Sequence, residues 1–156
     1  MAEKRIVLLL GGNIGVPQDT FEQAEKVINT RVGVVLARSR DHWSPPWGFS
    51  DERLFLNRAL VLRSGLSASE VLNACLRIET DLGRVRPADG TVVARPIDID
   101  ILAVEGHVIQ ENALLVPHPR LEQRRFALAP MADIWPSWRH PVTGLTVLEL
   151  LDNLPA

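Results

Sequence analysis

Four stretches of the chain are rich in apolar, β-prone residues and are bounded by glycine, proline or polar residues, a pattern typical of buried strands. They are residues 5–11, 34–42, 55–63 and 96–104. A short apolar pair at 108–109 is expected to pair back on the fourth stretch across the Glu105–Gly106 turn. Residues 43–49 are predicted to be irregular, because their two prolines fix φ and remove backbone donors.

Between these stretches the apolar residues recur every three or four positions, which predicts amphipathic helices. The first spans residues 17–31 and begins with a proline, which suits the first turn of a helix. The second begins after a capping box at Ser67–Glu70, and Gly83 is suited to end it. Two shorter helices are expected at 122–132 and 146–151.

The order of the predicted elements is β-α-β-β-α-β, followed by a C-terminal extension. This order is typical of the ferredoxin-like split βαβ unit. We therefore expect an α+β fold with a ferredoxin-like βαββαβ core, in which helices pack on an antiparallel sheet. The 156 residues are enough to bury one core, and they contain no repeat, linker or low-complexity tract. Residues 1–156 are thus predicted to form a single domain.

Two aspartates interrupt the fourth predicted strand. Because side chains alternate along a strand, Asp98 and Asp100 share one face, while Ile97, Ile99 and Ile101 point into the core. Two carboxylates on one face repel each other and are costly to desolvate, and a hard cation between them removes both problems. Mg²⁺ is typically held by one or two carboxylates plus substrate phosphates, which indicates a magnesium–nucleotide site. The alternative is an edge-strand pair that faces solvent.

Other charged residues have the chemistry to complete such a site. Phosphoryl-type transfer depends on positioning and on charge neutralisation by metal ions and by Arg or Lys. His118 lies between two prolines. It either donates a hydrogen bond to a phosphate or nucleotide, or is a structural histidine that is hydrogen-bonded to a nearby carbonyl. Each arginine, taken singly, is also compatible with a solvated surface position. The candidates are Glu79, Arg84, Arg86, Arg95, His118, Arg120, Arg124 and Arg125.

The third predicted strand carries a candidate ligand-binding pair. Asn57 interrupts its apolar run and shares a face with Phe55. A buried asparagine needs hydrogen-bond partners and its amide can read the edge of a heterocycle, while the aromatic ring offers a stacking surface. A solvent-wetted edge asparagine is the alternative. The glycine-rich turn at 11–15 lacks both the G-x-G-x-x-G spacing and a Gly-Lys-Ser/Thr ending, which excludes Rossmann and P-loop sites.

Composition limits the partners and the cellular location that we expect for the protein. The 17 Lys and Arg residues against 19 Asp and Glu give a net charge of −2, so we expect no nucleic-acid partner. The single cysteine, Cys75, excludes an intrachain disulfide. No apolar run approaches the ~20 residues of a membrane span, and the N-terminal apolar stretch is too short for a signal peptide. These observations lead us to expect a cytoplasmic enzyme. We also expect small-molecule substrates and a monomer, neither of which follows from composition.

The candidate residues and their spacing resemble one family, the 6-hydroxymethyl-7,8-dihydropterin pyrophosphokinases of folate biosynthesis. The matching blocks run nearly from end to end of the chain, and their order is more specific than any one of them. They are Gly12–Asn13, Ser44–Gly48, Phe55–Asn57, Ile78–Glu79, Leu82–Arg86, Arg95–Asp100, Pro117–Leu121 and Arg124–Phe126.

The resemblance implies transfer of the β,γ-diphosphate of ATP to the hydroxymethyl group of the pterin, with release of AMP. It implies that Asp98 and Asp100 hold two Mg²⁺ ions and that Arg84 and Arg95 share the catalytic role. The implied contacts of the co-substrate ATP are Glu79, Arg84, Arg86, Arg95, Ile101, His118 and Arg124. The implied pterin contacts are Ser44, Pro45, Trp47, Phe55, Asn57 and Phe126, with the two phenylalanines on opposite faces of the ring.

The chain departs from the family's usual pattern at several places, including Arg125, where members often have a glycine. Gly12 stands where a serine is usual, and Val92 stands where many members have a tryptophan that closes over the site. These departures suggest an alternative, a non-catalytic or altered-specificity paralogue that binds pterin or nucleotide, although the retained Asp98 and Asp100 argue against it. A ferredoxin-like RNA-binding module is disfavoured by the acidic balance and by the lack of an aromatic RNP signature.

Overall fold

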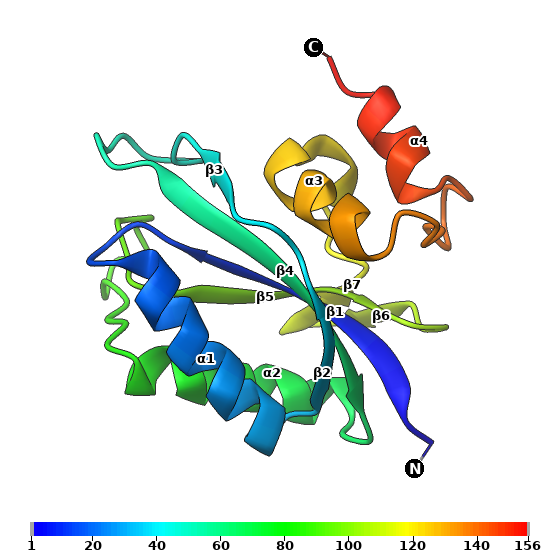
Figure 1. Ribbon diagram of the computed structural model, residues 1–156, viewed down its shortest axis with the longest axis horizontal. Helices are drawn as coiled ribbons and strands as arrows, with labels where there is room; N and C mark the ends of the chain where they lie inside the picture. The colour runs from blue at the N-terminus through cyan, green and yellow to red at the C-terminus, as the bar shows by residue number, and fades with distance from the viewer. Residues whose placement is uncertain (1, 156) are drawn as a thin grey trace.

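The computed structural model describes residues 2–155, whose arrangement Figure 1 shows. The strands are β1 (Lys4–Gly12), β2 (Val34–Arg38), β3 (His42–Ser44), β4 (Phe55–Ser64), β5 (Asp98–Val104), β6 (Ile109–Glu111) and β7 (Leu114–Val116). The helices are α1 (Pro17–Arg31), α2 (Ala68–Asp81), α3 (Arg125–Ile134) and α4 (Val147–Asp152), with a 3-10 turn, η1, at Leu121–Gln123. The predicted order of strands and helices is confirmed, with the second predicted strand divided between β2 and β3.

The main sheet is antiparallel and has the order β2-β4-β1-β5. The short strand β3 lies on the same edge of β4 as β2, opposite residues 55–57. β1 is central, so that Leu8 lies opposite both Leu60 and Ile101. This is the strand order of a βαββαβ unit, and the predicted α+β, ferredoxin-like fold is confirmed.

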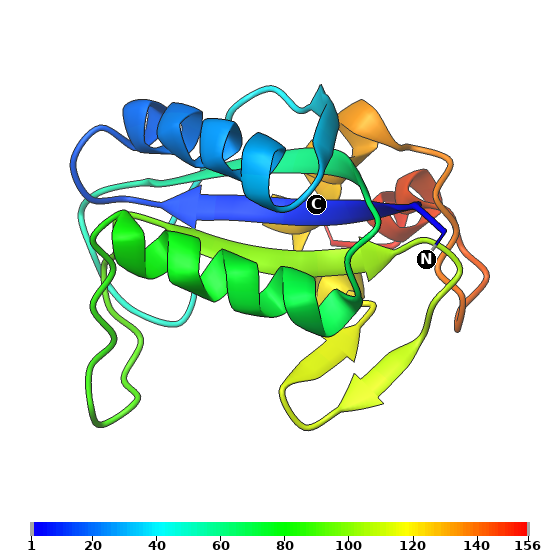
Figure 2. The same ribbon diagram turned by 90° about the horizontal axis from the view of Figure 1, so that it is seen from below.

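Helices cover both faces of the sheet (Figure 2). α1 and α2 lie side by side on one face, and α3 and α4 pack on the other. Neighbouring residues of β1 enter opposite cores, because Leu8 packs with the first pair of helices and Leu9 with the second. Ile97, Ile99 and Ile101 are buried in the first core, as the alternation in the fourth predicted strand indicated.

Local sequence signals account for the helix ends. Pro17 occupies the first turn of α1. The Ser67 hydroxyl accepts the Glu70 amide and the Glu70 carboxylate accepts the Ser67 amide, so the predicted capping box begins α2. Gly83, at φ +99°, takes the left-handed conformation that ends this helix and starts the arginine-rich loop. Within residues 2–155, no helix is long and apolar enough to span a bilayer.

The prediction of one strand over 34–42 is wrong, because the chain leaves the sheet at residues 39–41. Ser39 replaces part of the ladder with its side chain, whose hydroxyl accepts the Ala59 amide at 2.9 Å and donates to the Arg40 carbonyl at 2.7 Å. The chain then re-enters the sheet as β3, so Trp43 and Ser44 are extended rather than irregular. The pattern of apolar residues could not predict that the Ser39 side chain takes over hydrogen bonds of the strand.

The prediction that 108–109 pairs back on the fourth strand is also wrong. Ile109 instead lies opposite Val116 in the separate hairpin of β6 and β7. The hairpin turns at Asn112–Ala113, which contains a turn-forming asparagine but is not one of the Asn-Gly or Asp-Gly pairs by which two-residue hairpin turns are recognised.

Candidate active site

A cavity of about 410 Å³ opens where the end of β1 meets the beginnings of β4 and β5. α2, the start of α3 and the loops between strands complete its walls. Of the site residues that the family resemblance implies, only Ile101 is outside the cavity; Ile101 is buried and lines an adjoining hollow of about 270 Å³. The further sequence candidates Arg120 and Arg125 do not line the cavity either. The predicted residues that line the cavity are Ser44, Pro45, Trp47, Phe55, Asn57, Glu79, Arg84, Arg86, Arg95, Asp98, Asp100, His118, Arg124 and Phe126.

The two aspartates of β5 both face this cavity. Asp98 is paired: its Oδ1 lies 3.0 Å from a terminal nitrogen of Arg84, and its Oδ2 lies 3.0 Å from a terminal nitrogen of Arg95. Asp100 has no side-chain hydrogen bond within residues 2–155. Burial, together with the charges of Asp98 and Glu79, raises the pKa of Asp100 to about 7. The pair therefore holds one neutralised and one uncompensated carboxyl group.

The turn after β1 positions Arg95. The Asn13 amide donates to the Arg95 carbonyl at 3.0 Å, and the Arg95 amide donates to Asn13 Oδ1 at 3.2 Å. This contact brings the two backbones so close that a Cβ at Gly12 would collide with the carbonyl oxygen of Pro96. In this chain the glycine that replaces the family's usual serine is therefore required by the path of the segment that enters β5.

Glu79 joins α2 to the arginine loop. Its side chain is only 2% exposed, and its carboxylate accepts the Ile99 amide at 2.7 Å. The same carboxylate lies 2.7 Å from Arg86 and 3.3 Å from Arg84. Burial raises the pKa of Glu79. Through these contacts Glu79 fixes both the start of strand β5 and two of the cavity's arginines.

The far end of the cavity is built around Asn57, which is 1% exposed. Its amide nitrogen donates to Ser44 Oγ at 2.9 Å, to the His42 carbonyl at 3.2 Å and to the Phe55 carbonyl at 3.3 Å. No donor within the described residues contacts Oδ1. The saturated nitrogen leaves the carbonyl oxygen of Asn57 as the group that can accept a hydrogen bond from a ligand.

Aromatic rings and guanidinium groups meet between the two ends. The Arg95 guanidinium lies 4.8 Å from the ring centre of Phe55, and that of Arg124 lies 4.6 Å from Trp47 and 5.5 Å from Phe126. Burial lowers the pKa of Arg124. The Nε atoms of Arg95 and Arg124 are buried without a hydrogen-bond partner in the described chain. These two N–H groups therefore have no acceptor within the described chain and can donate to a ligand.

His118 lies in the cavity as a neutral side chain. Burial and the charge of Arg124 lower its pKa to about 4. Its Nδ1 accepts the Arg120 amide at 3.3 Å, which assigns the ring proton to Nε2. His118 can therefore donate one hydrogen bond at neutral pH without contributing a positive charge.

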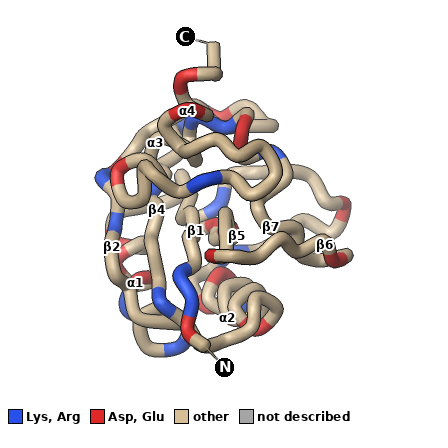
Figure 3. Tube along the Cα trace, turned by 90° about the vertical axis from the view of Figure 1, so that its right-hand side faces the viewer, with Lys and Arg blue, Asp and Glu red and all other residues tan. Residues whose placement is uncertain are grey.

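The donor set fits a hard divalent cation that is shared with a substrate. Within residues 2–155, no group of three His, Cys, Asp or Glu side chains forms a metal cage. The carboxylates of Asp98 and Asp100 both line the cavity, and one or two carboxylates are what Mg²⁺ typically takes from a protein together with substrate phosphates. A cation there would relieve the charge that raises the pKa of Asp100. Basic and acidic positions are interspersed along the chain in the view of Figure 3. Within the cavity, Arg84 pairs with both Glu79 and Asp98.

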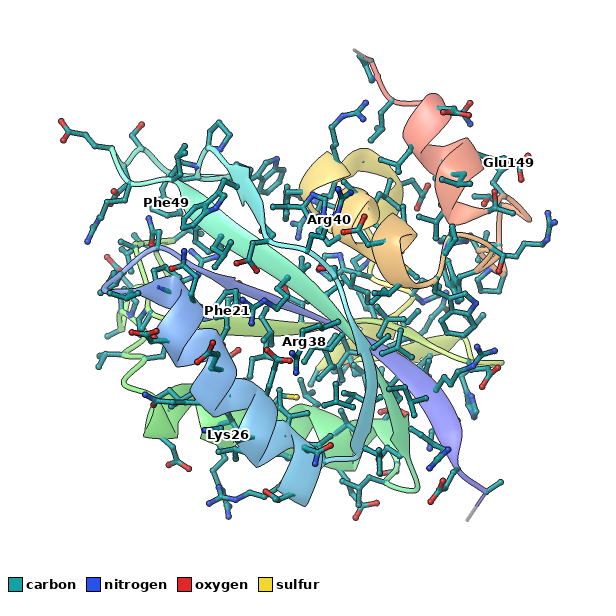
Figure 4. The ribbon with its side chains drawn as sticks, viewed as in Figure 1. Phe21, Lys26, Arg38, Arg40, Phe49 and Glu149 are labelled. Carbon is teal, nitrogen blue, oxygen red and sulfur yellow. The ribbon has the colours of Figure 1, made fainter. Side chains whose placement is uncertain are left out.

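Several residues near the site were not identified from the sequence. Leu72 and Leu76 of α2 line the cavity, although an apolar helical position signals only core packing. Phe49 lies in the loop between β3 and β4 (Figure 4), and its ring centre is 5.6 Å from the Arg95 guanidinium.

Two arginines that the sequence did single out lie outside the cavity lining. Arg120, a sequence candidate, lies 5.5 Å from Trp47. Arg125, another candidate, instead donates to the Pro155 carbonyl.

Comparison with known proteins agrees with this geometry. The model of the family "7,8-dihydro-6-hydroxymethylpterin-pyrophosphokinase" matches residues 7–136. The chain is 39% identical over 138 residues to the 2-amino-4-hydroxy-6-hydroxymethyldihydropteridine pyrophosphokinase of Porphyromonas gingivalis, covering 87% of this chain and 93% of the relative. It is also 39% identical over 151 residues to the protein of that name from Methylorubrum extorquens, covering 96% of this chain and 93% of the relative.

Solved structures share the fold. The Plasmodium falciparum HPPK-DHPS wild type with pteroate superposes with a TM-score of 0.80 at 14% identity, over 96% of this chain and 44% of that one. A crystal structure of HPPK-DHPS in complex with substrates gives a TM-score of 0.77 at 12% identity, over 97% of this chain and 43% of that one. The chain thus spans less than half the length of these solved proteins. From the family match and the 39% identical relatives, the chain belongs to the 7,8-dihydro-6-hydroxymethylpterin-pyrophosphokinase family.

Proposed function

We propose that this protein transfers the β,γ-diphosphate of ATP to 6-hydroxymethyl-7,8-dihydropterin and releases AMP, a step of folate biosynthesis. One observation carries the proposal: a single cavity is lined by two aspartates with arginines, and by a buried asparagine with aromatic rings. The first set of residues suits a metal-bound polyphosphate and the second a flat heterocycle. The names of the 39% identical relatives support the same reaction.

The aromatic end would bind the pterin. Phe55 and Phe126 offer faces for stacking, and Asn57 Oδ1 offers an acceptor to an N–H group on the ring edge. Ser44 and Trp47 line the same end, where their backbone groups would complete the hydrogen bonds to the ring. Pro45, the sixth predicted pterin contact, stiffens the backbone between them.

The charged end would bind ATP. Arg84, Arg95 and Arg124 supply cationic donors, and the unpartnered Nε atoms of the last two favour an anion with several acceptor oxygens. His118 Nε2 would add a neutral donor. The adjoining hollow, which contains Ile101, is lined mostly by apolar residues, with the polar residues Asp100, Asn112 and His118 beside them, and would suit the nucleoside. Glu79 and Arg86, which pair with each other, would act on ATP by holding the arginine loop in place.

Asp98 and Asp100 would hold the two Mg²⁺ ions that we propose for this reaction. When bound, Mg²⁺ neutralises charge on the transferring phosphates and orients the reacting oxygens. Arg84 and Arg95 pair with Asp98 in the protein alone, and both would turn from that carboxylate to a phosphate when the metal ions bind. In the reaction, the hydroxymethyl oxygen forms a bond to the β-phosphorus, and the bond from that phosphorus to the oxygen it shares with the α-phosphate breaks. AMP leaves with that oxygen, and the hydroxyl proton is lost to water.

The protein's main contribution would be alignment. Fixing the pterin at one end and the triphosphate at the other converts a meeting of two substrates into a step within one complex, which is worth several kcal/mol, on the order of 7 or more in well-oriented systems. The walls also hold cationic donors where negative charge develops. No residue at the aromatic end within the described chain is a strong general base, so positioning and charge carry the proposal.

An AMP-release assay tests this function. The protein is incubated with ATP, Mg²⁺ and 6-hydroxymethyl-7,8-dihydropterin, and AMP and the pterin diphosphate are separated by ion-exchange chromatography. We expect the two products in equal amounts, and none in a control without pterin. AMP formed without the pterin would indicate simple hydrolysis, and an absence of both products would refute the proposal.

We further propose that residues 1–156 act as one domain, as a monomer, in the cytoplasm where ATP is available. Each of the two cores contains residues of the central strand β1, which supports a single cooperative unit. Light scattering after gel filtration tests the oligomeric state. A mass of about twice 17.3 kDa would exclude the monomer.

A further inference from the structure

An acidic side chain on α3, outside the cavity, ties this helix to the segment before β3. The side chain of Asp133 is 15% exposed. Its carboxylate accepts the Arg40 backbone amide at 3.1 Å and the two guanidinium nitrogens of Arg40 at 3.0 and 3.3 Å. It also lies 2.8 Å from His42 Nε2. Figure 4 shows Arg40 beside α3, at this junction.

The segment that Asp133 holds leads directly to Asn57. His42 lies opposite Asn57 in the sheet, and its carbonyl accepts the Asn57 amide nitrogen at 3.2 Å. Ser44, two residues on, accepts the same nitrogen through its hydroxyl. The side chain of His42 thus faces Asp133 while its backbone fixes the orientation of the Asn57 amide.

β3 needs such an anchor because it is short. It contains 3 residues and lies at the edge of the sheet, between the break at residues 39–41 and the loop with two prolines. A second anchor acts on the opposite side, where Arg58 Nε lies 2.8 Å from Asp41 and Arg58 itself is held by Glu25 at 2.7 Å. Asp133 of α3 therefore holds Arg40 and His42, and Arg58 of β4 holds Asp41 between them.

The same helix carries both the anchor and a wall of the cavity. Phe126 and Asp133 are seven residues apart on α3, which places them on one side of the helix. Phe126 lines the cavity, and Asp133 holds the strand that faces it. The contact therefore sets the spacing between the aromatic wall and the Asn57 acceptor.

We propose that Asp133, acting through His42, is a positioning residue for the pterin end of the active site. This inference rests on the proposed function. Asp133 touches no substrate; it fixes β3 against α3 so that the Asn57 amide is held by Ser44 and His42 before the pterin arrives. Loss of the contact should loosen the pterin end and leave the ATP end, which is built on β5 and the arginine loop, as it is.

The test is steady-state kinetics on Asp133→Asn, Asp133→Leu and His42→Phe. For Asp133→Leu we expect the KM for pterin to rise about tenfold. The kcat and the KM for ATP should stay at the wild-type values, because binding in the ground state and in the transition state is weakened equally. Asp133→Asn, which keeps one acceptor, should lie between the wild type and Asp133→Leu.

Glu105→Gln provides a matched control. The Glu105 carboxylate also accepts an arginine's backbone amide, that of Arg5 at 3.2 Å, and the guanidinium of the same residue at 2.6 and 3.1 Å, but it does not line the cavity. The substitution removes a comparable ion pair, and it should leave the KM for pterin unchanged. A rise equal to that of Asp133→Asn would show general destabilisation and overturn the inference.

The double variant Asp133→Leu/His42→Phe separates positioning from bulk stability. If the two residues act in one chain of contacts, the KM for pterin of the double variant should equal that of the worse single variant. Additive effects, or an unchanged KM in every variant that folds by circular dichroism, would overturn the inference while wild-type turnover upholds the proposed function. If the wild type itself forms no pterin diphosphate, both fail. Should Asp133→Leu not fold, Asp133→Asn and His42→Phe carry the test.

Discussion

Replacing Asp100 by asparagine should stabilise the metal-free protein while abolishing its activity. In the structure this carboxyl group faces the cavity beside Asp98, has no side-chain hydrogen bond within residues 2–155, and has its pKa raised from 3.8 to about 7, mainly by burial. Its ionised form is therefore unfavourable in the folded chain above neutrality. An asparagine of the same shape removes that charge, and it also removes the proposed ligand of Mg²⁺.

The pKa of Asp100 gives the size and the sign of the expected change in stability. A change from 3.8 to about 7 corresponds to at most about 4 kcal/mol at high pH. Because the residue keeps some exposure to the cavity and water there screens part of the charge, we expect a gain of about 1–2 kcal/mol for Asp100→Asn. The folded state binds the extra proton between these two pKa values, so wild-type stability falls as pH rises from about 4 to 7. The gain should be full at pH 8 and absent near pH 4.

Urea denaturation at several pH values, in EDTA, measures this difference. Asp133→Asn is a control of opposite sign: although burial opposes it, hydrogen bonds from Arg40 and His42 lower the pKa of Asp133, so this variant should lose stability above pH 4. Mg²⁺ with ATP should then stabilise the wild type and not Asp100→Asn. A stability of Asp100→Asn at or below that of the wild type at pH 8, or a gain that does not depend on pH, would refute the reasoning.

Three further predictions concern activity. Asp98→Ala should lower the rate of AMP release at least about a hundredfold without unfolding the chain, and near-normal release would contradict the proposed metal site. Asn57→Ala should weaken pterin binding about ten- to a hundredfold in a fluorescence titration and leave ATP binding unchanged; equal losses for both substrates would argue against Asn57 as a pterin contact. Val92→Trp should tighten ATP binding, because Val92 lines the cavity and is 50% exposed, so a larger ring there can cover the nucleotide. An identical ATP dissociation constant in calorimetry would mean that the missing aromatic residue has no effect.

The parts of the site that depend on local periodicity could be predicted from the sequence. The alternation of side chains in a strand brings Asp98 and Asp100 to one wall and Phe55 and Asn57 to another. The capping box at Ser67 likewise predicted where α2 begins. In each case the residues that decide the outcome lie within a few positions of one another.

The pairing of charges could not be predicted in this way. Arg84 and Arg95 are both candidates for phosphate contact, yet in the protein alone both hold Asp98, and Arg86 holds Glu79. These choices depend on the path of the loop at 84–95, which has no periodicity. The contact between Asp133 and His42 spans 91 positions and joins two residues that no motif connects.

These ion pairs imply that the two ligands of the charged end bind together. The carboxylates of Glu79 and Asp98 are already paired with arginines, whereas that of Asp100 is not, so a cation or a triphosphate that binds alone at Asp98 has to break existing ion pairs. A triphosphate alone would draw Arg84 and Arg95 away from Asp98 and leave that carboxylate beside Asp100. A cation alone would displace the same arginines without giving them an acceptor. When both arrive, the carboxylates pair with the cation and the arginines with the phosphates, and every charge keeps a partner.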